Sequence, residues 1–337
     1  MNLSSKLRTS YDEAAAVFAR FDPALQVPTV SPAYLLIDCE RDPELQPVFW
    51  LYQEADAVFY YGFHLAEIPG TRYRDIQAPY PYSGPVCNTQ DAAFLRRAWQ
   101  EYANWCRSHG VAVEFARFHP LLRNWDFYEG EVIVERATVW IDLAIPDLLA
   151  SYETRARTAV RKALKNGVTV EWRTGGDSAN LFFRLYSDAM CELSADAFYL
   201  FSEAYFHRLL EWERARLAVC ISGGEPIAAA IFLFGPEVAE YHLSAASRVG
   251  KRLGATNLLL HTAAQVAQAE GCRKLYLGGG TDARPDNPLL FFKAGFSMAR
   301  AEFRIGKRVH SKDAYCFLQK RFAEAHKAHP GRVLFYR

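Results

Sequence analysis

The chain has 337 residues, more than one ordinary hydrophobic core contains, so its length predicts two domains. Hydrophobic residues make up 50% of the chain and charged residues 23%, a balance that excludes a disordered protein. With 39 basic and 38 acidic residues, the net charge of +1 excludes an overall attraction to nucleic acid or acidic membranes, although it permits a local basic face.

The first 25 residues contain no uninterrupted apolar stretch, so we expect no signal peptide. No segment reaches the roughly 20 apolar residues that span a bilayer. The cysteines form no CxxC pair and no Cys/His cluster with ligand spacing, which argues against a disulfide framework and a metal site. We therefore predict a cytoplasmic protein with reduced cysteines, which number seven: Cys39, Cys87, Cys106, Cys191, Cys220, Cys272 and Cys316.

In the first half of the chain, aromatic and β-branched runs predict strands and one helical pattern stands out. Phe94, Tyr102 and Trp105 recur at helical spacing, Asp91 can cap the helix, and Gly110 can end it. The expected elements are strands at 48–52, 58–65, 111–115 and 132–141 and a helix at 91–108.

The second half repeats this mixture of strands and helices. Its expected helices lie at 146–166, 180–213 with a break near 194–198, 255–270 and 289–294; its expected strands lie at 169–173, 217–222, 226–234, 238–244, 274–277 and 314–319. Antiparallel strands followed by strand–helix–strand predict an α/β (α+β) fold of two related domains. We place the domains at residues 1–148 and 149–337, and the last strands can cross back to the first domain.

The helix expected at 146–166 carries five basic residues: Arg155, Arg157, Arg161, Lys162 and Lys165. At 100° per residue Arg157, Arg161 and Lys165 share one side, opposite an apolar stripe. Two interpretations are open. The basic side is a solvated face, or it binds an anion such as a pyrophosphate, a nucleotide or the backbone of a tRNA.

Residues 278–280 form a glycine triplet that partly fits a dinucleotide-binding fingerprint. Such a fingerprint needs a helix to start there, but Pro285 and Pro288 interrupt it, so we reject that function. The triplet instead indicates a tight turn or a close approach of the backbone to a ligand. Further on, Lys293 stands among apolar and aromatic residues. It can extend to solvent, or it can stabilise an oxyanion or a phosphate.

Several of these segments, in this order, resemble the FemABX-like branch of the Gcn5-related N-acetyltransferase (GNAT) superfamily. The resembling segments are Pro79–Pro85, the basic helix ending at Gly167, Phe198-Tyr199 with Tyr205-Phe206, Tyr241–Ala255, and Tyr276–Gly280 followed by Phe292–Phe296. The resemblance is most extensive over residues 145–300. It implies two tandem GNAT-like domains, each with a mixed, mostly antiparallel sheet flanked by helices.

The resemblance also implies transfer of an acyl or aminoacyl group to an amine. In GNAT proteins the loop from strand to helix at this place binds the pyrophosphate of coenzyme A through an R/Q-x-x-G-x-G/A pattern. The nearest match here is Lys251-x-x-Gly254-x-Thr256. The peptidoglycan ligases of the family commonly carry an acidic residue before the double glycine, where this chain has Tyr276-Leu277, so the donor stays open between acyl-CoA and aminoacyl-tRNA.

The expected site follows from these segments. An amine that has lost its proton attacks a thioester or ester carbonyl directly, so the reaction needs no Ser or Cys nucleophile. The expected catalytic residues are Lys293, Tyr241, Tyr276 and His242; the residues expected to bind the donor cofactor are Arg248, Gly250, Lys251, Gly254 and Ala255; the residues expected to bind substrate are Tyr82, Arg157, Arg161, Tyr199 and Phe292. On strand 238–244, Glu240 shares a face with His242, and either can act as a base.

Three functions are compatible with this site. One is N-acylation, from acyl-CoA, of an amine on a small molecule or a cell-envelope glycan precursor. The second is aminoacyl-tRNA-dependent ligation to a peptidoglycan precursor. The third is a catalytically silent module that binds a nucleotide-linked glycan. No metal is expected in any of them.

Overall fold

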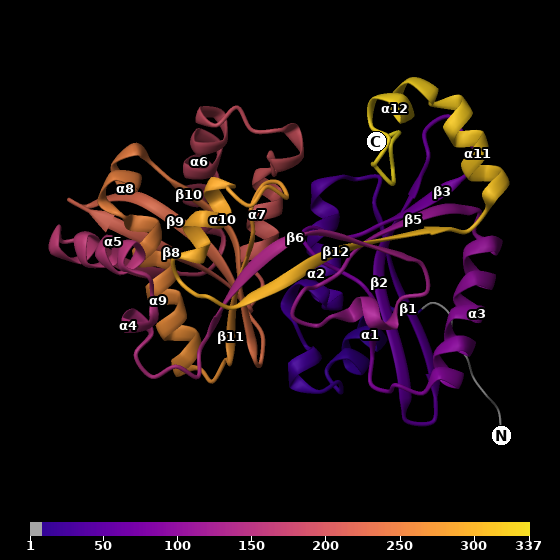
Figure 1. Cartoon of the computed structure of the whole chain (residues 1–337), viewed down its shortest axis with the longest axis horizontal. Helices are drawn as coiled ribbons and strands as arrows, with labels where there is room; N and C mark the ends of the chain where they lie inside the picture. The colour runs from indigo at the N-terminus through magenta and orange to yellow at the C-terminus, as the bar shows by residue number, and fades with distance from the viewer. Residues whose placement is uncertain (1–8) are drawn as a thin grey trace. The chain divides into compact units, whose positions relative to one another are not determined.

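The computed structural model describes residues 9–337, which fall into two compact units (Figure 1). Of the described residues, unit 1 contains 9–25, 29–135 and 303–337, and unit 2 contains 26–28 and 136–302. Residues 136–148 therefore lie in unit 2, although the sequence placed them in the first domain, and 303–337 lie in unit 1. The signal-peptide expectation concerns in part residues 1–8, which are outside the described residues.

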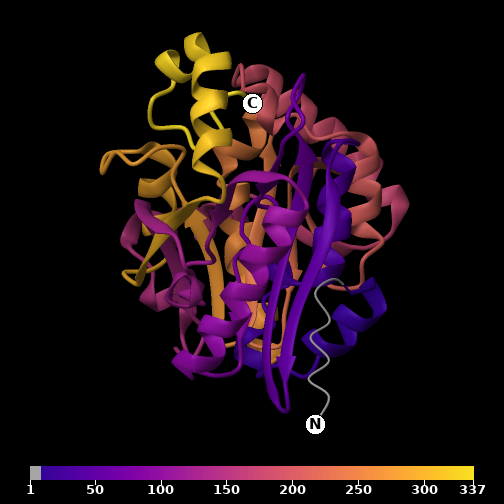
Figure 2. The ribbon, with the colours of Figure 1, turned by 90° about the vertical axis from the view of Figure 1, so that its right-hand side faces the viewer.

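Unit 1 is built on a sheet in which β1, β2, β3, β5 and part of β12 lie side by side. β1 and β2 form a long antiparallel hairpin (Figure 2). The strands are β1 Gln46–Glu54, β2 Ala57–Glu67, β3 Arg74–Gln77, β4 Val86–Cys87, β5 Val111–Arg117 and β12 Arg300–Val309; the helices are α1 Tyr11–Phe18, α2 Pro32–Asp38, α3 Ala92–Ser108, α11 Lys312–Arg321 and α12 Ala323–Ala328.

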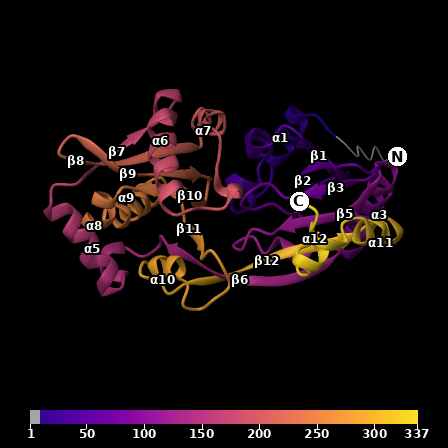
Figure 3. The same cartoon turned by 90° about the horizontal axis from the view of Figure 1, so that it is seen from above.

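Helices cover both faces of the hairpin in unit 1, because successive side chains of a strand point to opposite faces. Phe59 contacts Trp99 of α3, with ring centroids 5.3 Å apart. Its neighbour Tyr60 contacts Phe18 of α1 at 5.7 Å. Figure 3 shows α1 and α3 on opposite sides of these strands. Burial on both faces explains why β1 and β2 are almost continuously apolar instead of alternating.

Unit 2 contains the remaining strands in the order β6, β11, β10, β9, β8, β7. All neighbours in this series are antiparallel except β10 and β11, which are parallel. The strands are β6 Glu131–Asp142, β7 Thr169–Arg173, β8 Ala215–Ser222, β9 Glu225–Phe234, β10 Val238–Ala246 and β11 Lys274–Gly279; the helices are α4 Leu148–Ser151, α5 Thr154–Lys165, α6 Gly176–Glu192, α7 Glu203–Leu210, α8 Arg248–Leu253, α9 Ala255–Ala269 and α10 Pro288–Ala294.

The sheet of unit 2 also carries helices on both faces. α5, α8 and α9 lie on one side of the strands and α6 and α7 on the other (Figure 3). The core beneath α9 is aliphatic and fully buried, with Leu259, Ala263 and Ala267 at helical spacing. None of the helices in residues 9–337 has the length and apolar composition that crossing a membrane requires.

Two expectations about elements are wrong. The stretch 314–319 was expected to be a strand, but it belongs to α11, which Ser311 caps and which buries Ala314, Tyr315 and Leu318. The helix expected at 146–166 is interrupted between α4 and α5. Tyr152 is extended there, and its buried ring contacts Phe296 and His261 at centroid distances of 5.0 and 5.6 Å.

Candidate functional site

The central feature of unit 2 is the separation of its two parallel strands. β10 and β11 pair only over Val238–Glu240 and Lys274–Tyr276. Beyond these residues β10 continues beside β9 as far as Ala246, and β11 continues beside β6 as far as Gly279. The carboxyl ends of β10 and β11 therefore diverge, which is where open α/β sheets commonly bind ligands.

Both strands are irregular at the point of divergence. The register of β10 against β9 shifts between Tyr241 and Leu243, and that of β11 against β6 shifts between Tyr276 and Gly278. A bulge gives one strand an extra residue, bends it and increases its twist. The two register shifts occur directly after the last paired residues of β10 and β11, where the strands separate. The expected residues Tyr241, His242 and Tyr276 therefore lie at the point where the separation begins.

Lys293 lies on α10 beside the glycine turn that follows β11. Its side chain is buried, and its Nζ donates a hydrogen bond to the carbonyl oxygen of Gly279 at 2.8 Å. The Nζ also lies 5.7 Å from the ring centroid of Tyr241. Burial lowers the pKa of Lys293 to about 7, and the nearby charge of Arg136 acts in the same direction. Lys293 and Tyr241, both expected catalytic residues, are thus brought together.

Each glycine of the triplet has a structural reason to be glycine. Gly278 has a φ of +79°, which L side chains rarely adopt. A Cβ on Gly279 would lie 2.8 Å from the carbonyl oxygen of Ala137, and one on Gly280 would lie 2.4 Å from Oδ1 of Asn287. Of the two interpretations drawn from the sequence, a tight turn and a close approach to a ligand, the tight turn is enough to explain why these three residues are glycines.

Two residues at this turn were missed by the sequence analysis. Arg136 donates to the carbonyl oxygen of Gly280 at 2.9 Å, so two cations hold successive carbonyls of the turn. Asn287 is fully buried, caps α10 by accepting from the amides of Leu289 and Leu290, and donates to Thr281 at 2.8 Å. The Asn-Pro start of α10 was a detectable signal for Asn287. Nothing local indicates Arg136, which is 144 residues from its partner.

The other expected catalytic residues have clear places in unit 2. The hydroxyl of Tyr241 hydrogen-bonds Ser244, and burial raises the pKa of Tyr241 to about 12 although that bond lowers it. His242 shares a hydrogen bond of 2.8 Å between its Nε2 and the hydroxyl of Tyr205 on α7. Tyr276 is buried and lies opposite Glu240 of β10. His242 thus faces α7, whereas Tyr241 lies near α10.

The segment after β10 forms a helix start. Ser247 caps α8 by accepting from the amide of Gly250 at 3.1 Å. Arg248 and Lys251 both contact Glu192 at the end of α6, at 3.1 and 3.6 Å. The side chain of Arg248 is 86% exposed, so this ion pair is weak and can exchange for another anion.

The two glycines expected to bind the donor are packing positions. A Cβ on Gly250 would lie 2.2 Å from the carbonyl oxygen of Ile227 in β9. Gly254 has a φ of +78°, and a Cβ there would lie 2.7 Å from the carbonyl oxygen of Ala159 in α5. The next residue, Ala255, is buried at the start of α9. Their contacts bring α8 close to the sheet and the start of α9 close to α5.

Each of the expected substrate-binding residues makes its own local contacts. Arg157 donates to the carbonyl oxygens of Ala150 and Tyr152, so it caps the end of α4. Arg161 is exposed on α5. Phe292 packs on Phe296 at the edge of the unit 2 core, with centroids 5.7 Å apart.

Two further residues expected to bind substrate lie outside that core. Tyr199 follows α6 and accepts a hydrogen bond from Tyr186 through its carbonyl oxygen. Tyr82 is in unit 1, where its ring contacts those of His119 and Phe303 at 5.3 and 5.5 Å. The described part of the chain, residues 9–337, contains no group of three or more His, Cys, Asp or Glu side chains able to hold a metal.

In unit 2 the parallel pair of strands opens beside a capped helix and a buried lysine. The chain as a whole, with its two units, has a two-domain GNAT-like fold. Residues 150–285 match the family model described as "Acetyltransferase (GNAT) domain", so this segment is a GNAT domain. No curated protein sequence matches the chain.

Several solved structures share the fold at low sequence identity. The crystal structure of FemX matches with a TM-score of 0.71 and 15% identity, covering 92% of this chain and 98% of that one. The C-terminal domain of a putative lysylphosphatidylglycerol synthetase from Agrobacterium fabrum matches with a TM-score of 0.60 and 16% identity, covering 94% and 96%. L-PGS from Bacillus licheniformis gives 0.52 and 14%, covering 81% and 88%. The Fem-like resemblance read from the sequence is thus confirmed at the level of fold.

Proposed function

We propose that the protein is an N-acyltransferase that moves an acyl group from acyl-CoA to an amine on a small molecule or a cell-envelope glycan precursor. The observation that carries this proposal is the divergence of β10 and β11 inside the segment that is a GNAT domain. A thioester needs a narrow space lined by backbone hydrogen-bonding groups, and diverging strands expose such groups without a ladder partner.

The reaction requires a neutral amine and a stabilised oxyanion. The amine nitrogen forms a bond to the thioester carbon, the carbon–sulfur bond breaks, and the proton lost by the amine balances the thiolate that leaves as a thiol. His242, held by Tyr205, is the proposed proton acceptor. Tyr241 and Tyr276 are the proposed hydrogen-bonding residues at the start of the divergence.

Lys293 is the proposed source of positive charge for the oxyanion or the departing sulfur. Its ammonium is buried and already held by Gly279, so little reorganisation is needed when negative charge develops. A pKa of about 7 means that both protonation states are populated near neutral pH. We assign the cationic state to catalysis, and the pH dependence of the rate tests that assignment.

The phosphates of the donor would lie near the start of α8. Arg248 and Lys251 are the proposed cations, because each can exchange Glu192 for a phosphate. Gly250, Gly254 and Ala255 are proposed to contribute the close backbone packing that positions α8 and α9. The proposed substrate contacts remain Arg157, Arg161, Tyr199, Phe292 and Tyr82.

The fold shared with FemX supports a second candidate, an aminoacyl ligase whose donor is an aminoacyl-tRNA. Donor binding distinguishes the two. Titration calorimetry of the purified protein with coenzyme A, acetyl-CoA and an aminoacyl-tRNA should give saturable heat with the coenzyme A compounds. Heat with the tRNA alone would favour the ligase, and no heat with any of them would favour a silent binding module.

Turnover is measured as thiol release from acetyl-CoA in the presence of a panel of amines. Lys293→Ala should lower kcat by about a hundredfold, the typical loss when one group that stabilises the oxyanion is removed. Lys312→Ala, an exposed lysine at the start of α11 in unit 1, is the matched control and should keep full activity. Equal activity of the Lys293 variant, with an unchanged melting temperature, would remove Lys293 from the mechanism.

A further inference from the structure

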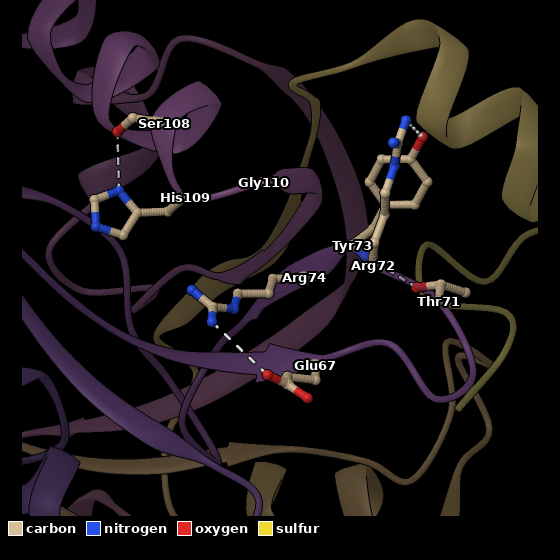
Figure 4. Close-up of a pocket in the computed structure, with 8 residues that line it drawn as sticks. All are labelled: Glu67, Thr71, Arg72, Tyr73, Arg74, Ser108, His109 and Gly110. Atoms are coloured by element: carbon tan, nitrogen blue, oxygen red, sulfur yellow. Dashed lines mark hydrogen bonds and ion pairs between the residues drawn. The ribbon is translucent and has the colours of Figure 1, made fainter.

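Unit 1 contains a hollow of about 360 Å³ that none of the roles above uses. It lies between the turn that joins β2 to β3 and the end of α3, and Figure 4 shows the residues that line it. This volume is at the lower end of the range for small-ligand sites. The turn itself is held by three hydrogen bonds. The amide of Ile68 donates to the carbonyl oxygen of Tyr73 at 2.9 Å, and the amide and the hydroxyl of Thr71 both donate to the carbonyl oxygen of Ile68.

Arg74 is the main cation of this hollow. Its amide is fixed by the carbonyl oxygen of Gly110 at 3.0 Å, so its position on β3 is well defined. Its guanidinium contacts only Glu67, the residue opposite it on β2, at 3.7 Å. Within residues 9–337 that side chain has no other ionic or hydrogen-bonding partner. Most of the five N–H donors of the guanidinium are therefore available to a ligand.

His109 supplies a second polar group with a fixed orientation. Its ring stacks on Trp105, with centroids 4.1 Å apart, and its Nδ1 lies 2.8 Å from the carbonyl oxygen of Trp105. A carbonyl only accepts hydrogen bonds, so Nδ1 carries the hydrogen. Nε2 is then the nitrogen left to accept a hydrogen bond, or to donate one when the ring is protonated. Figure 4 shows the guanidinium of Arg74 between the carboxylate of Glu67 and the ring of His109.

The hollow lies beside the C-terminal end of α3, and the C-terminal end of a helix carries a partial negative charge that repels an anion. Here that charge is reduced, because the carbonyl oxygen of Trp105 accepts from both His109 and the hydroxyl of Ser108, the latter at 2.9 Å. The opposing carboxylate of Glu67 is 74% exposed, so solvent screens its charge more than that of Arg74, which is 37% exposed. The balance of charges in the hollow therefore favours a negatively charged ligand.

We propose that Arg74 and His109 form a binding site for the oxyanion group, carboxylate or phosphate, of a small molecule. The guanidinium fork pairs with two oxygens of the group, replacing the long contact with Glu67. Nε2 of His109 binds a third oxygen or the protonated oxygen of a monoester. Tyr73 forms a wall of the hollow, and Arg72 stacks on that ring at 5.3 Å.

The test is a titration of the full chain with two probes, glycerol 3-phosphate and malonate, at constant ionic strength. Binding is followed by calorimetry and by tryptophan fluorescence, to which Trp105, the residue on which His109 stacks, contributes. Saturable binding of either probe supports the site. The stronger of the two shows whether phosphate or carboxylate is its natural group. No saturable signal with either probe overturns the proposal.

Three variants make the result specific to these side chains. Arg74→Gln should weaken binding about tenfold, the loss expected when one charge-assisted contact is removed. His109→Asn keeps a donor for the carbonyl of Trp105 but lacks Nε2, and should weaken binding severalfold. Glu67→Gln removes the competing carboxylate and should tighten binding.

The matched control is Arg96→Gln, which removes an exposed arginine from α3 in the same unit and should leave affinity unchanged. Circular dichroism checks that each variant is folded; Arg74 and Glu67 are both substantially exposed, so we expect them to be. Equal losses in the Arg74 and Arg96 variants would show unspecific attraction and contradict the site. Weaker binding by the Glu67 variant would also contradict it, because it would mean that the carboxylate supports binding of the anionic probe instead of competing with it for Arg74.

Discussion

Lys293 illustrates how burial changes what a side chain can do. A lysine in water is protonated at neutral pH, but the apolar surroundings of α10 disfavour the charged form and lower the pKa to about 7. The sequence indicated this residue because a single lysine stood among aromatic neighbours. It could not indicate the partner, since Gly279 meets Lys293 only when β11 and α10 pack together.

The lowered pKa makes stability depend on pH. Unfolded Lys293 has a pKa near 10.5, so the unfolded chain binds more protons than the folded one between about pH 7 and that value. The contribution of Lys293 to the free energy of unfolding should therefore rise with pH across this window and be lost as the pH falls through 7. Urea titrations at several pH values should show a smaller slope for Lys293→Met than for the wild type. A variant with the wild-type slope would contradict the burial of the ammonium.

The same residue should shape the pH dependence of the rate. If the cation is the active form, kcat/KM falls as the pH rises through about 7. Lys293→Arg keeps a charge at all accessible pH values, so that descending limb should disappear even if the maximal rate is lower. A pH–rate profile with acetyl-CoA measures this, and a descending limb that survives in the arginine variant would assign it to another group.

In unit 1 a buried carboxylate has a structural role. Glu114 is fully buried and accepts hydrogen bonds from Tyr61 and Tyr102 at 2.8 Å and from His310 at 3.0 Å. Burial opposes its ionisation, but the hydrogen bond and charge of His310 lower its pKa overall. Its contribution to stability is therefore present above about pH 4.5 and is lost as the pH falls further.

Glu114→Ala should cost about 3 kcal/mol of unfolding free energy, because it leaves three buried donors without their acceptor. Chemical denaturation measures the loss. Glu129→Ala, which removes a 58% exposed partner of Arg308, is the control and should cost less than about 1 kcal/mol. Equal effects of the two variants would mean that the cluster around Glu114 contributes nothing beyond a surface ion pair.

At the scale of elements, helical spacing of apolar residues predicted α3, and apolar runs that end at turns or glycines predicted α9 and the three strands β8 to β10. The sequence pattern did not predict the break between α4 and α5 at Tyr152, because no glycine or proline marks it. The break exists because the ring of Tyr152 packs in the core while Arg157 caps the carbonyls of α4. The prediction of a strand at 314–319 was wrong because aromatic residues are common both in strands and on buried helix faces.

The two bulges of β10 and β11 were also beyond prediction. They depend on the pairing of each strand with its neighbour, which a single sequence does not contain. The residues at the divergence, Tyr241 and Tyr276, were nevertheless identified, through the resemblance to a family. Arg136 was missed for the same reason as the bulges, because its role depends on a contact between distant segments.

Gly250 determines how closely α8 approaches β9. Gly250→Ala places a Cβ 2.2 Å from the carbonyl oxygen of Ile227, and backbone atoms on both sides must move. We expect a loss of about 2 kcal/mol in unfolding free energy and a weaker affinity for coenzyme A. Gly331→Ala, with no atom within 4 Å of the added Cβ, is the control for denaturation and calorimetry. If Gly250→Ala had the unfolding free energy and the coenzyme A affinity of the wild type, α8 could be displaced without consequence.

At the scale of the whole molecule, unit 2 has its own core and the consecutive strands from β6 to β7 in the sheet order. A fragment of residues 136–302 should therefore fold and unfold cooperatively in a thermal melt. A fragment of residues 149–302 lacks the part of β6 that pairs with β11, which exposes the edge beside Leu275 and Leu277. That shorter fragment should aggregate or melt without cooperativity. Equal behaviour of the two fragments would place the boundary near residue 148, where the sequence put it.

The division of the chain into units has a consequence for its synthesis. Unit 2 is an insertion in unit 1, since residues 303–337 return to the unit in which the chain began. Multidomain proteins generally fold from the N-terminus as they emerge from the ribosome. In this protein the second unit leaves the ribosome complete while the first still waits for the end of β12 and for α11. We therefore expect β1 and β2, which are aromatic and buried on both faces in the structure, to be exposed to aggregation until the end of β12 and α11 have joined unit 1.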